Sequence, residues 1–72
     1  KPVFVKIDAS LIRHIERDNA NQQFVRMIID VAHRMDCRVI AEGIEHLEQK
    51  QTLENMYIDG VQGFLIARPS PL

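Results

Sequence analysis

The 72-residue sequence predicts an α/β fold in which three parallel strands alternate with helices and form part of a barrel larger than the chain. Apolar runs rich in β-branched residues at 3–8, 38–41 and 61–66 alternate with helical patterns at 20–35 and 46–57. This alternation favours parallel pairing through right-handed crossovers, which places both helices on one face of the sheet. Nothing in the sequence covers the opposite face, although parallel sheets are normally covered on both.

The first run, Val3 to Asp8, is expected to be a strand, and residues 10–15 a short helical turn. Residues 20–35 carry apolar side chains at helical spacing, and Asn19 or Asn21 is expected to cap this helix. The stripe expected to pack in the core contains Phe24, Ile28, Val31, Ala32 and Met35, with Met27 beside it.

The second strand, residues 38–41, runs into Glu42 and Gly43. The weaker helix at 46–57 is expected to bury Leu47, Leu53, Met56 and Tyr57. A turn at Asp59 and Gly60 then leads to the third strand, and the prolines at positions 69 and 71 end it because proline cannot continue a central ladder.

Alternate side chains of each strand point to opposite faces of the sheet. One face is apolar and suits packing under the helices: Val3, Val5, Ile7, Val39, Ala41, Val61 and Leu65. The other mixes apolar and polar or ionisable groups: Phe4, Lys6, Asp8, Ile40, Glu42, Gln62 and Phe64. In a closed barrel this mixed face would be interior, and its charged groups would lie at the carboxyl ends of the strands, where parallel barrels carry their chemistry. The start at Lys1, without Met, agrees with a portion of a larger protein.

The composition, with 46% hydrophobic and 26% charged residues, is that of a soluble globular protein. A net charge of −1 gives no electrostatic reason to expect polymeric nucleic acid or a membrane as a partner. The single cysteine, Cys37, cannot form an internal disulfide, which favours a reducing, cytoplasmic setting.

Three segments, residues 4–8, 41–45 and 62–69, together resemble the EAL family of bacterial cyclic-di-GMP phosphodiesterases. Lys6 and Glu42 are 36 positions apart, and Glu42 and Gln62 are 20 apart. The resemblance covers the chain, so residues 1–72 are expected to be the C-terminal portion of an EAL domain. It implies the last three strands and intervening helices of a (β/α)8 TIM-like barrel, incomplete on its own.

The resemblance also implies hydrolysis of cyclic-di-GMP to linear pGpG with two Mg²⁺ or Mn²⁺ ions. Lys6, Glu42 and Gln62 are the expected catalytic residues. Lys6 resembles the family's lysine beside the attacking water and the phosphate, where an ammonium stabilises developing negative charge. Glu42 resembles a glutamate assigned either to a metal ion or to general-base work. Gln62 resembles the glutamine that hydrogen-bonds the metal-bound water.

Four further positions, Asp8, Glu45, Phe64 and Arg68, match the family and are the expected substrate-binding residues; Phe64 stands where many members have Tyr. The Glu-Ala-Leu signature and most metal ligands lie outside the sequence, so the 72 residues alone are expected to be inactive. The expected partners are cyclic-di-GMP and the remainder of the barrel, and the parent protein can carry membrane or sensor domains. Two alternatives are an inactive EAL-like domain that binds cyclic-di-GMP or a protein, and a separate small protein that completes its sheet by oligomerising, for example as a homodimer.

Structural interpretations compete with these roles. Lys6 could form a structural ion pair with Asp8 or Glu42, and Gln62 could be a hydrogen-bonded core amide. The cluster of Glu45, His46 and Glu48 is expected to be the solvated first turn of a helix, and His14 and His33 are expected to be exposed.

Overall fold

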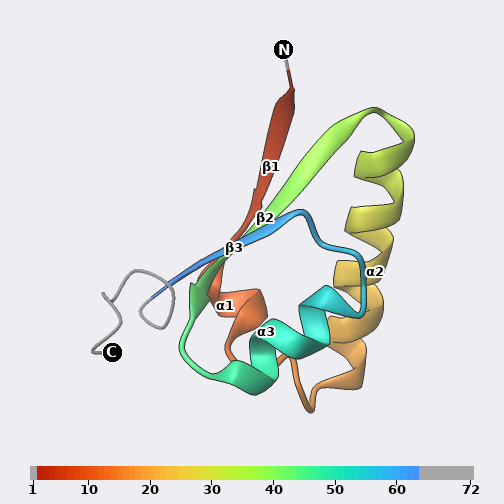
Figure 1. Cartoon of the computed structure of the whole chain (residues 1–72). Coiled ribbons are helices and arrows are strands. Elements are labelled where there is room, and N and C mark those ends of the chain that lie inside the picture. Colours follow the sequence, from red (N-terminus) through yellow and green to blue (C-terminus); the bar gives the residue numbers. More distant parts are fainter. Residues whose placement is uncertain (1, 64–72) are drawn as a thin grey trace.

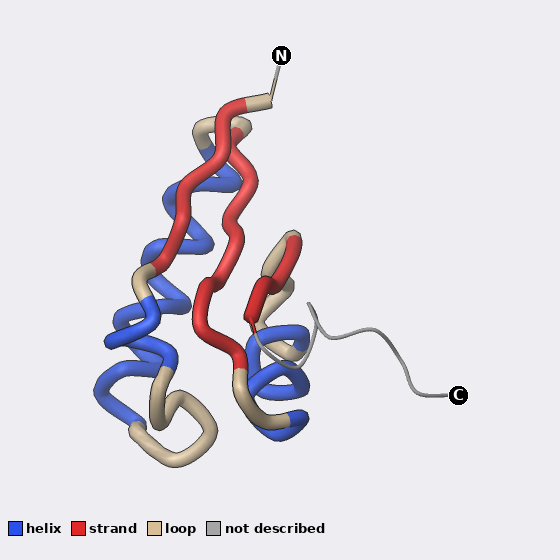
Figure 2. Tube along the Cα trace, turned by 90° about the vertical axis from the view of Figure 1, so that its left-hand side faces the viewer, coloured by secondary structure: helices blue, strands red, loops and turns tan. Residues whose placement is uncertain are grey.

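The computed structural model describes residues 2–63, which form three parallel strands and three helices. The strands are β1 (Val3–Ile7), β2 (Cys37–Ile44) and β3 (Gly60–Gly63), in the spatial order β1-β2-β3. The helices are α1 (Ala9–Ile12), α2 (Asn19–Arg34) and α3 (Leu47–Glu54). All three helices gather on one side of the sheet, as the alternation of elements predicts (Figures 1 and 2).

The apolar side of the sheet lies under the helices and forms the core. In the parallel register Val5 pairs with Val39, and Ala41 pairs with both Ile7 and Val61. Ile7, Val39 and Ala41 are buried and Val5 and Val61 partly buried, as predicted. Val3, at the start of the edge strand, is 59% exposed, and Leu65 lies outside the described residues.

The cap of α2 is Asp18 rather than Asn19 or Asn21. Its carboxylate accepts a hydrogen bond from the Asn21 backbone N–H at 3.0 Å. A carboxylate satisfies an unpaired helix N–H and also complements the positive end of the helix dipole, whereas an amide does only the former.

The buried stripe of α2 agrees with the predicted one only at Ala32 and, in part, at Ile28. Val25, Ile29 and Ala32 pack in the core, and Ile28 is partly buried. We call the exposed apolar residues beside them the α2 flank: Phe24, Met27, Val31 and Met35, exposed by 44%, 55%, 49% and 69%. Two apolar stripes lie next to each other on this helix, and the sequence pattern alone does not show which one faces the sheet.

Helix α3 is shorter than the predicted segment 46–57. Leu53 and Met56 are buried as expected, whereas Leu47 and Tyr57 are 54% and 81% exposed. Tyr57 lies beyond the end of α3, with a φ of 66° in the left-handed region, and so does not continue the buried side of this helix. Strand β2 is longer than the predicted 38–41, because its pairing continues to Ile44 across an irregularity.

Candidate active site

Lys6, Glu42 and Gln62 lie on what we call the bare face, the face of the sheet opposite the helices. Each follows a core-facing residue in its strand, so its own side chain points to the other side. Each also lies in the carboxyl-terminal half of its strand. The structure therefore brings the three predicted catalytic residues to one edge of one face, where parallel barrels carry their active sites.

Lys6 and Glu42 form an ion pair, with 3.6 Å between Lys6 Nζ and Glu42 Oε2. Their side chains are 57% and 40% exposed, so within residues 2–63 this pair is accessible to solvent. The ion pair that the structural interpretation expects between these residues is thus present, and it is compatible with a catalytic role for both.

A bulge in β2 lies at Glu42 and Gly43, where the strand carries Glu42 on the bare face. Ala41 pairs with Val61 and Ile44 pairs with Gly63, so two residues, Glu42 and Gly43, oppose the single residue Gln62. The extra residue also returns Ile44 to the core, where it is fully buried. Bulges recur beside active sites because they redirect side chains in this way.

Gly43 is required at this bulge for two reasons. Its φ of 83° lies in the left-handed region, which disfavours other residues. A Cβ at this position would lie 2.4 Å from Ala9 Cβ, because the bulge packs directly against the start of α1. The bulge is therefore fixed in place by its contact with α1.

Asp8 caps α1, and its carboxylate accepts a hydrogen bond from the Ser10 N–H at 2.9 Å. Hydrogen bonds from Ser10 hold the pKa of the exposed Asp8 below its usual value. Asp8 is thus engaged by its own helix, next to the strand end that carries Lys6. Glu45 is exposed, while Phe64 and Arg68 lie outside the described residues.

The described residues can supply part of a divalent metal site but not a complete set of ligands. Glu42 offers oxygen ligands of the kind that Mg²⁺ and Mn²⁺ prefer, and Gln62 lies opposite it across the bulge. Residues 2–63 contain no group of three or more His, Cys, Asp or Glu side chains placed to hold a metal. Glu45, His46 and Glu48 are exposed at the start of α3, as expected for a solvated first turn.

Gln49, which no sequence pattern singled out, is fully buried behind this edge. It occupies the third position of α3 and accepts a hydrogen bond from the His46 N–H at 2.8 Å. The usual sequence signal for such a contact is Ser or Thr three residues before Gln or Glu. Here His46 stands where Ser or Thr is usual, so the signal is absent.

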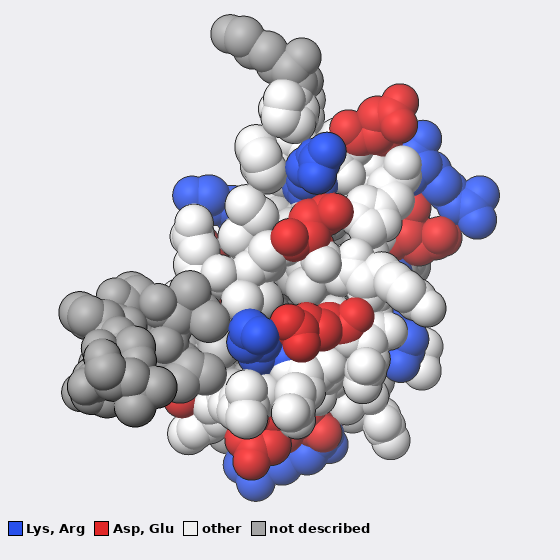
Figure 3. Space-filling model, viewed as in Figure 1, with Lys and Arg blue, Asp and Glu red and all other residues white. Residues whose placement is uncertain are grey.

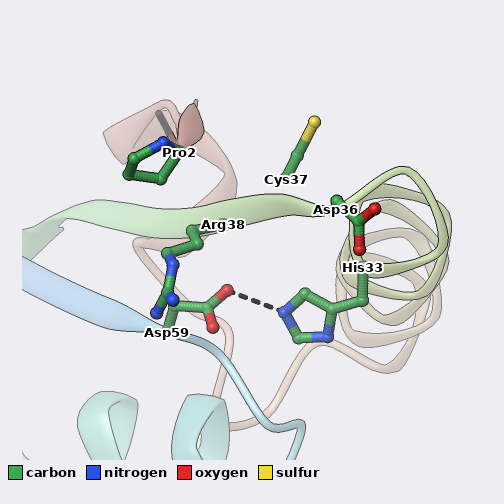
Figure 4. A pocket seen from close by; sticks show the side chains of 6 residues that line it. All are labelled: Pro2, His33, Asp36, Cys37, Arg38 and Asp59. Carbon is green, nitrogen blue, oxygen red and sulfur yellow. Dashed lines mark hydrogen bonds and ion pairs between the residues drawn. The ribbon is translucent and has the colours of Figure 1, made fainter.

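A second cluster lies at the opposite end of the strands, around the ion pair of His33 with Asp59 (Figure 4). Asp59 Oδ2 accepts from His33 Nε2 and from the Val39 N–H, each at 2.7 Å. Burial opposes ionisation of Asp59, but these two bonds and the charges of His33 and Arg38 outweigh it and lower its pKa. His33 is exposed by 37% of its side chain, so the expected exposure is confirmed but its partner was not foreseen.

An open hollow of about 560 Å³ surrounds this ion pair. The Cys37 side chain, although it is part of the lining, points away from the ion pair (Figure 4). Its lining residues are Pro2, His33, Asp36, Cys37, Arg38 and Asp59. Acidic and basic side chains are intermixed over the face of the molecule seen in Figure 3. No helix within residues 2–63 has the length and apolar character needed to cross a bilayer.

Comparison with known sequences gives matches over nearly the whole chain. The profile of the EAL domain matches residues 1–69. The signalling protein YkoW of Bacillus subtilis is 40% identical over 67 residues, which are 93% of this chain and 8% of YkoW. The cyclic di-GMP phosphodiesterase PdeR of Escherichia coli is 37% identical over 67 residues, which are 93% of this chain and 10% of PdeR.

Comparison of structures agrees. Klebsiella pneumoniae BlrP1, solved as a complex with manganese and cyclic di-GMP, superposes with a TM-score of 0.88 at 35% identity. The match covers 96% of this chain and 18% of the BlrP1 chain. The chain thus spans a small part of the length of each protein it matches, and its sheet corresponds to one part of a TIM barrel.

Proposed function

The chain belongs to the EAL domain family, and we propose that it supplies Lys6, Glu42 and Gln62 to the active centre of a complete barrel domain that hydrolyses cyclic-di-GMP to linear pGpG. The observation that carries this proposal is the convergence of the three side chains on one edge of the bare face. These residues are far apart in the sequence, and a purely structural sheet has no need to gather a cation, a carboxylate and an amide there.

In this reaction the ammonium of Lys6 faces the phosphodiester and stabilises the negative charge that grows on its oxygens. Glu42 contributes a carboxylate to the metal centre, and the Gln62 amide orients the water by hydrogen bonding. Divalent Mg²⁺ or Mn²⁺ ions, when bound, supply Lewis-acid activation of the water and the phosphate. Lys6 and Glu42 already lie within ion-pair distance at this edge before substrate arrives.

Asp8, Glu45, Phe64 and Arg68 are proposed to help bind the dinucleotide, since they lie in the segments next to the three catalytic residues in sequence. For Asp8 the structure adds a competing structural role as the cap of α1. The lone Cys37 agrees with a reducing, cytoplasmic location for the domain.

The remainder of the barrel is the proposed partner of the exposed apolar surfaces. The α2 flank turns away from Met56 and Tyr57, which lie on the other side of α2 beside Arg26 and His33. It therefore lies toward the open edge of β1, where a preceding strand and helix of a barrel would pack. A second copy of the chain, as in a homodimer, is the alternative occupant.

The experiment is incubation of the complete barrel domain with cyclic-di-GMP and Mn²⁺, with chromatographic detection of pGpG. Metal-dependent appearance of pGpG supports the proposal. Binding of cyclic-di-GMP without pGpG formation would instead support the inactive, ligand-binding class of EAL-like domain. The 72-residue chain, tested in parallel, is expected to form no pGpG, because one carboxylate cannot complete the coordination that Mg²⁺ or Mn²⁺ requires.

A further inference from the structure

Gln49 stands out among residues 2–63 as a fully buried polar side chain with every hydrogen-bonding position in use. Its Nε2 donates to the backbone oxygens of Ile12 and Arg13, at 3.2 and 2.9 Å. Its Oε1 accepts from the backbone N–H groups of Glu45 and His46, at 2.6 and 2.8 Å. A glutamine amide has two donor hydrogens and two acceptor lone pairs, so the side chain is fully satisfied.

These four partners are backbone groups at the ends of two different helices. Ile12 and Arg13 end α1, and Glu45 and His46 precede α3. The last carbonyls and first N–H groups of helices have no partner within the helix and need one from elsewhere when buried. One side chain meets this need at both helices and thereby joins them.

The two joined segments are those that follow the strands carrying Lys6 and Glu42. Asp8 alone separates β1 from α1, and Glu45 directly follows β2. A shift of α1 against the segment at Glu45 would therefore change the separation of the two charged side chains. The ion pair cannot resist such a shift, since both side chains are accessible and exposed ion pairs contribute little.

We propose that Gln49 is a positioning residue for the catalytic centre, acting as a buried clamp that fixes the strand carrying Lys6 against the bulge carrying Glu42. The effect on catalysis rests on the proposed function, whereas the effect on the geometry of the Lys6–Glu42 pair does not. A clamp of this kind fits the general need of active sites for side chains held by a second layer of hydrogen bonds.

The first test replaces Gln49 by Met in the complete barrel domain, because Met keeps the shape of Gln but removes all four hydrogen bonds. The matched control is Gln22→Met. Gln22 Nε2 donates to the Ile15 oxygen at 2.7 Å, in the turn before α2 and away from the strand ends. We expect Gln49→Met to lower kcat about 10- to 100-fold with little change in KM, because a small misplacement of reacting groups has effects of this size. Gln22→Met should leave both constants near the wild-type values.

A second variant, Gln49→Glu, makes the effect depend on pH, and its kcat is expressed per folded molecule at each pH because an ionised buried carboxylate also destabilises the fold. An ionised carboxylate can accept from Glu45 and His46 but cannot donate to the carbonyls of Ile12 and Arg13. Protonation restores one donor, and burial favours the protonated form. The ratio of variant to wild-type kcat should therefore rise as the pH is lowered from about 8 to about 6, within the range in which a buried carboxyl takes up its proton.

An activity-independent readout separates this proposal from the proposed function. The NMR resonance of the Lys6 ε-carbon reports on its pairing, and Gln49→Met should shift it in the same direction as Glu42→Gln. If the wild-type domain forms no pGpG, the proposed function fails. The positioning role of Gln49 is then tested by the Lys6 resonance alone. A folded Gln49→Met domain with wild-type kcat, or with an unshifted Lys6 resonance, would overturn the proposal. Failure of both Gln49 variants to fold would also overturn it, since Gln49 would then serve the fold as a whole.

Discussion

Lys6 Nζ lies 3.6 Å from Glu42 Oε2 although the two residues are not opposite each other in the sheet. The register pairs Lys6 with Ile40, and Glu42 stands two positions further along β2, inside the bulge. The contact therefore depends on long side chains that reach across the bare face from neighbouring strands. Its geometry is set by the backbone at the bulge and at the start of α1.

This pair is expected to contribute little to stability. Accessible ion pairs are worth about 0–1 kcal/mol, because solvent screens the charges and both side chains lose freedom. Because the carboxyl ends of barrel strands stay open to substrate and solvent, we predict that Lys6→Met changes the free energy of unfolding of the barrel domain by less than about 1 kcal/mol. Urea denaturation followed by circular dichroism measures this, and a loss of several kcal/mol would mean that Lys6 is primarily structural.

Gly43 should be far more sensitive. Replacement by Ala adds a Cβ that would lie 2.4 Å from Ala9 Cβ, at a residue whose φ is 83°. The combined strain of left-handed backbone and overpacking predicts destabilisation by about 2–4 kcal/mol. The control is Gly60→Ala, where the nearest atom to the new Cβ is Ile40 Cγ1 at 3.7 Å. Equal unfolding midpoints for the two variants in urea would contradict the account of the bulge.

The sequence predicts the strand–helix alternation and the two faces of the sheet because both follow from short-range periodicity. Residues such as Ile7, Val39 and Ala41 occupy the core as the period-2 rule requires. The choice of stripe on α2 is not predictable in this way, since Val25 and Val31 are equally apolar and tertiary packing selects between them.

The candidate site, too, is predictable from the sequence only in part. Family spacing indicates Lys6, Glu42 and Gln62 as candidates, and the structure gathers them on one face. The contact of Gly43 with Ala9 and the bonds of Gln49 to the carbonyls at the end of α1 join segments distant in sequence, which no local pattern encodes.

Asp59 is predicted to make stability depend on pH in the acid range. Its folded pKa is lowered from 3.8, so the folded state favours the ionised form. The resulting stabilisation is present above pH 3.8 and is lost as the pH falls through the lowered folded pKa. We predict that Asp59→Asn is less stable than wild type by about 1–2 kcal/mol near neutral pH, as expected for loss of charge-assisted hydrogen bonds. The difference should shrink below pH 3.8.

Asp30→Asn is the control for this comparison. Asp30 also pairs with a cation, Arg34, but the two side chains are 63% and 76% exposed. Its removal should change the free energy of unfolding by less than about 0.5 kcal/mol. Denaturant titrations of the three proteins across the acid range measure both effects, and a pH-independent difference between Asp59→Asn and wild type would contradict the assignment.

The α2 flank offers a test of the missing part of the barrel. Val31 is 49% exposed within the described residues, yet a preceding helix of the complete domain should cover it. We predict that Val31→Lys destabilises the complete domain by more than about 2 kcal/mol, because it buries an unpaired charge. Gln23→Lys, at an exposed polar position of the same helix, should be neutral. Equal thermal midpoints for these variants would show that the flank stays exposed in the barrel.

The most direct test of the catalytic assignment is the rate of pGpG formation from cyclic-di-GMP by the complete domain, compared with its Lys6→Met and Glu42→Gln variants at saturating Mn²⁺. We predict metal-dependent product from the wild type and a decrease of at least about 100-fold in kcat for each variant, as for loss of electrostatic stabilisation of the transition state. Wild-type rates in either variant, with both folded, would contradict the claim that this edge of the sheet carries out the chemistry.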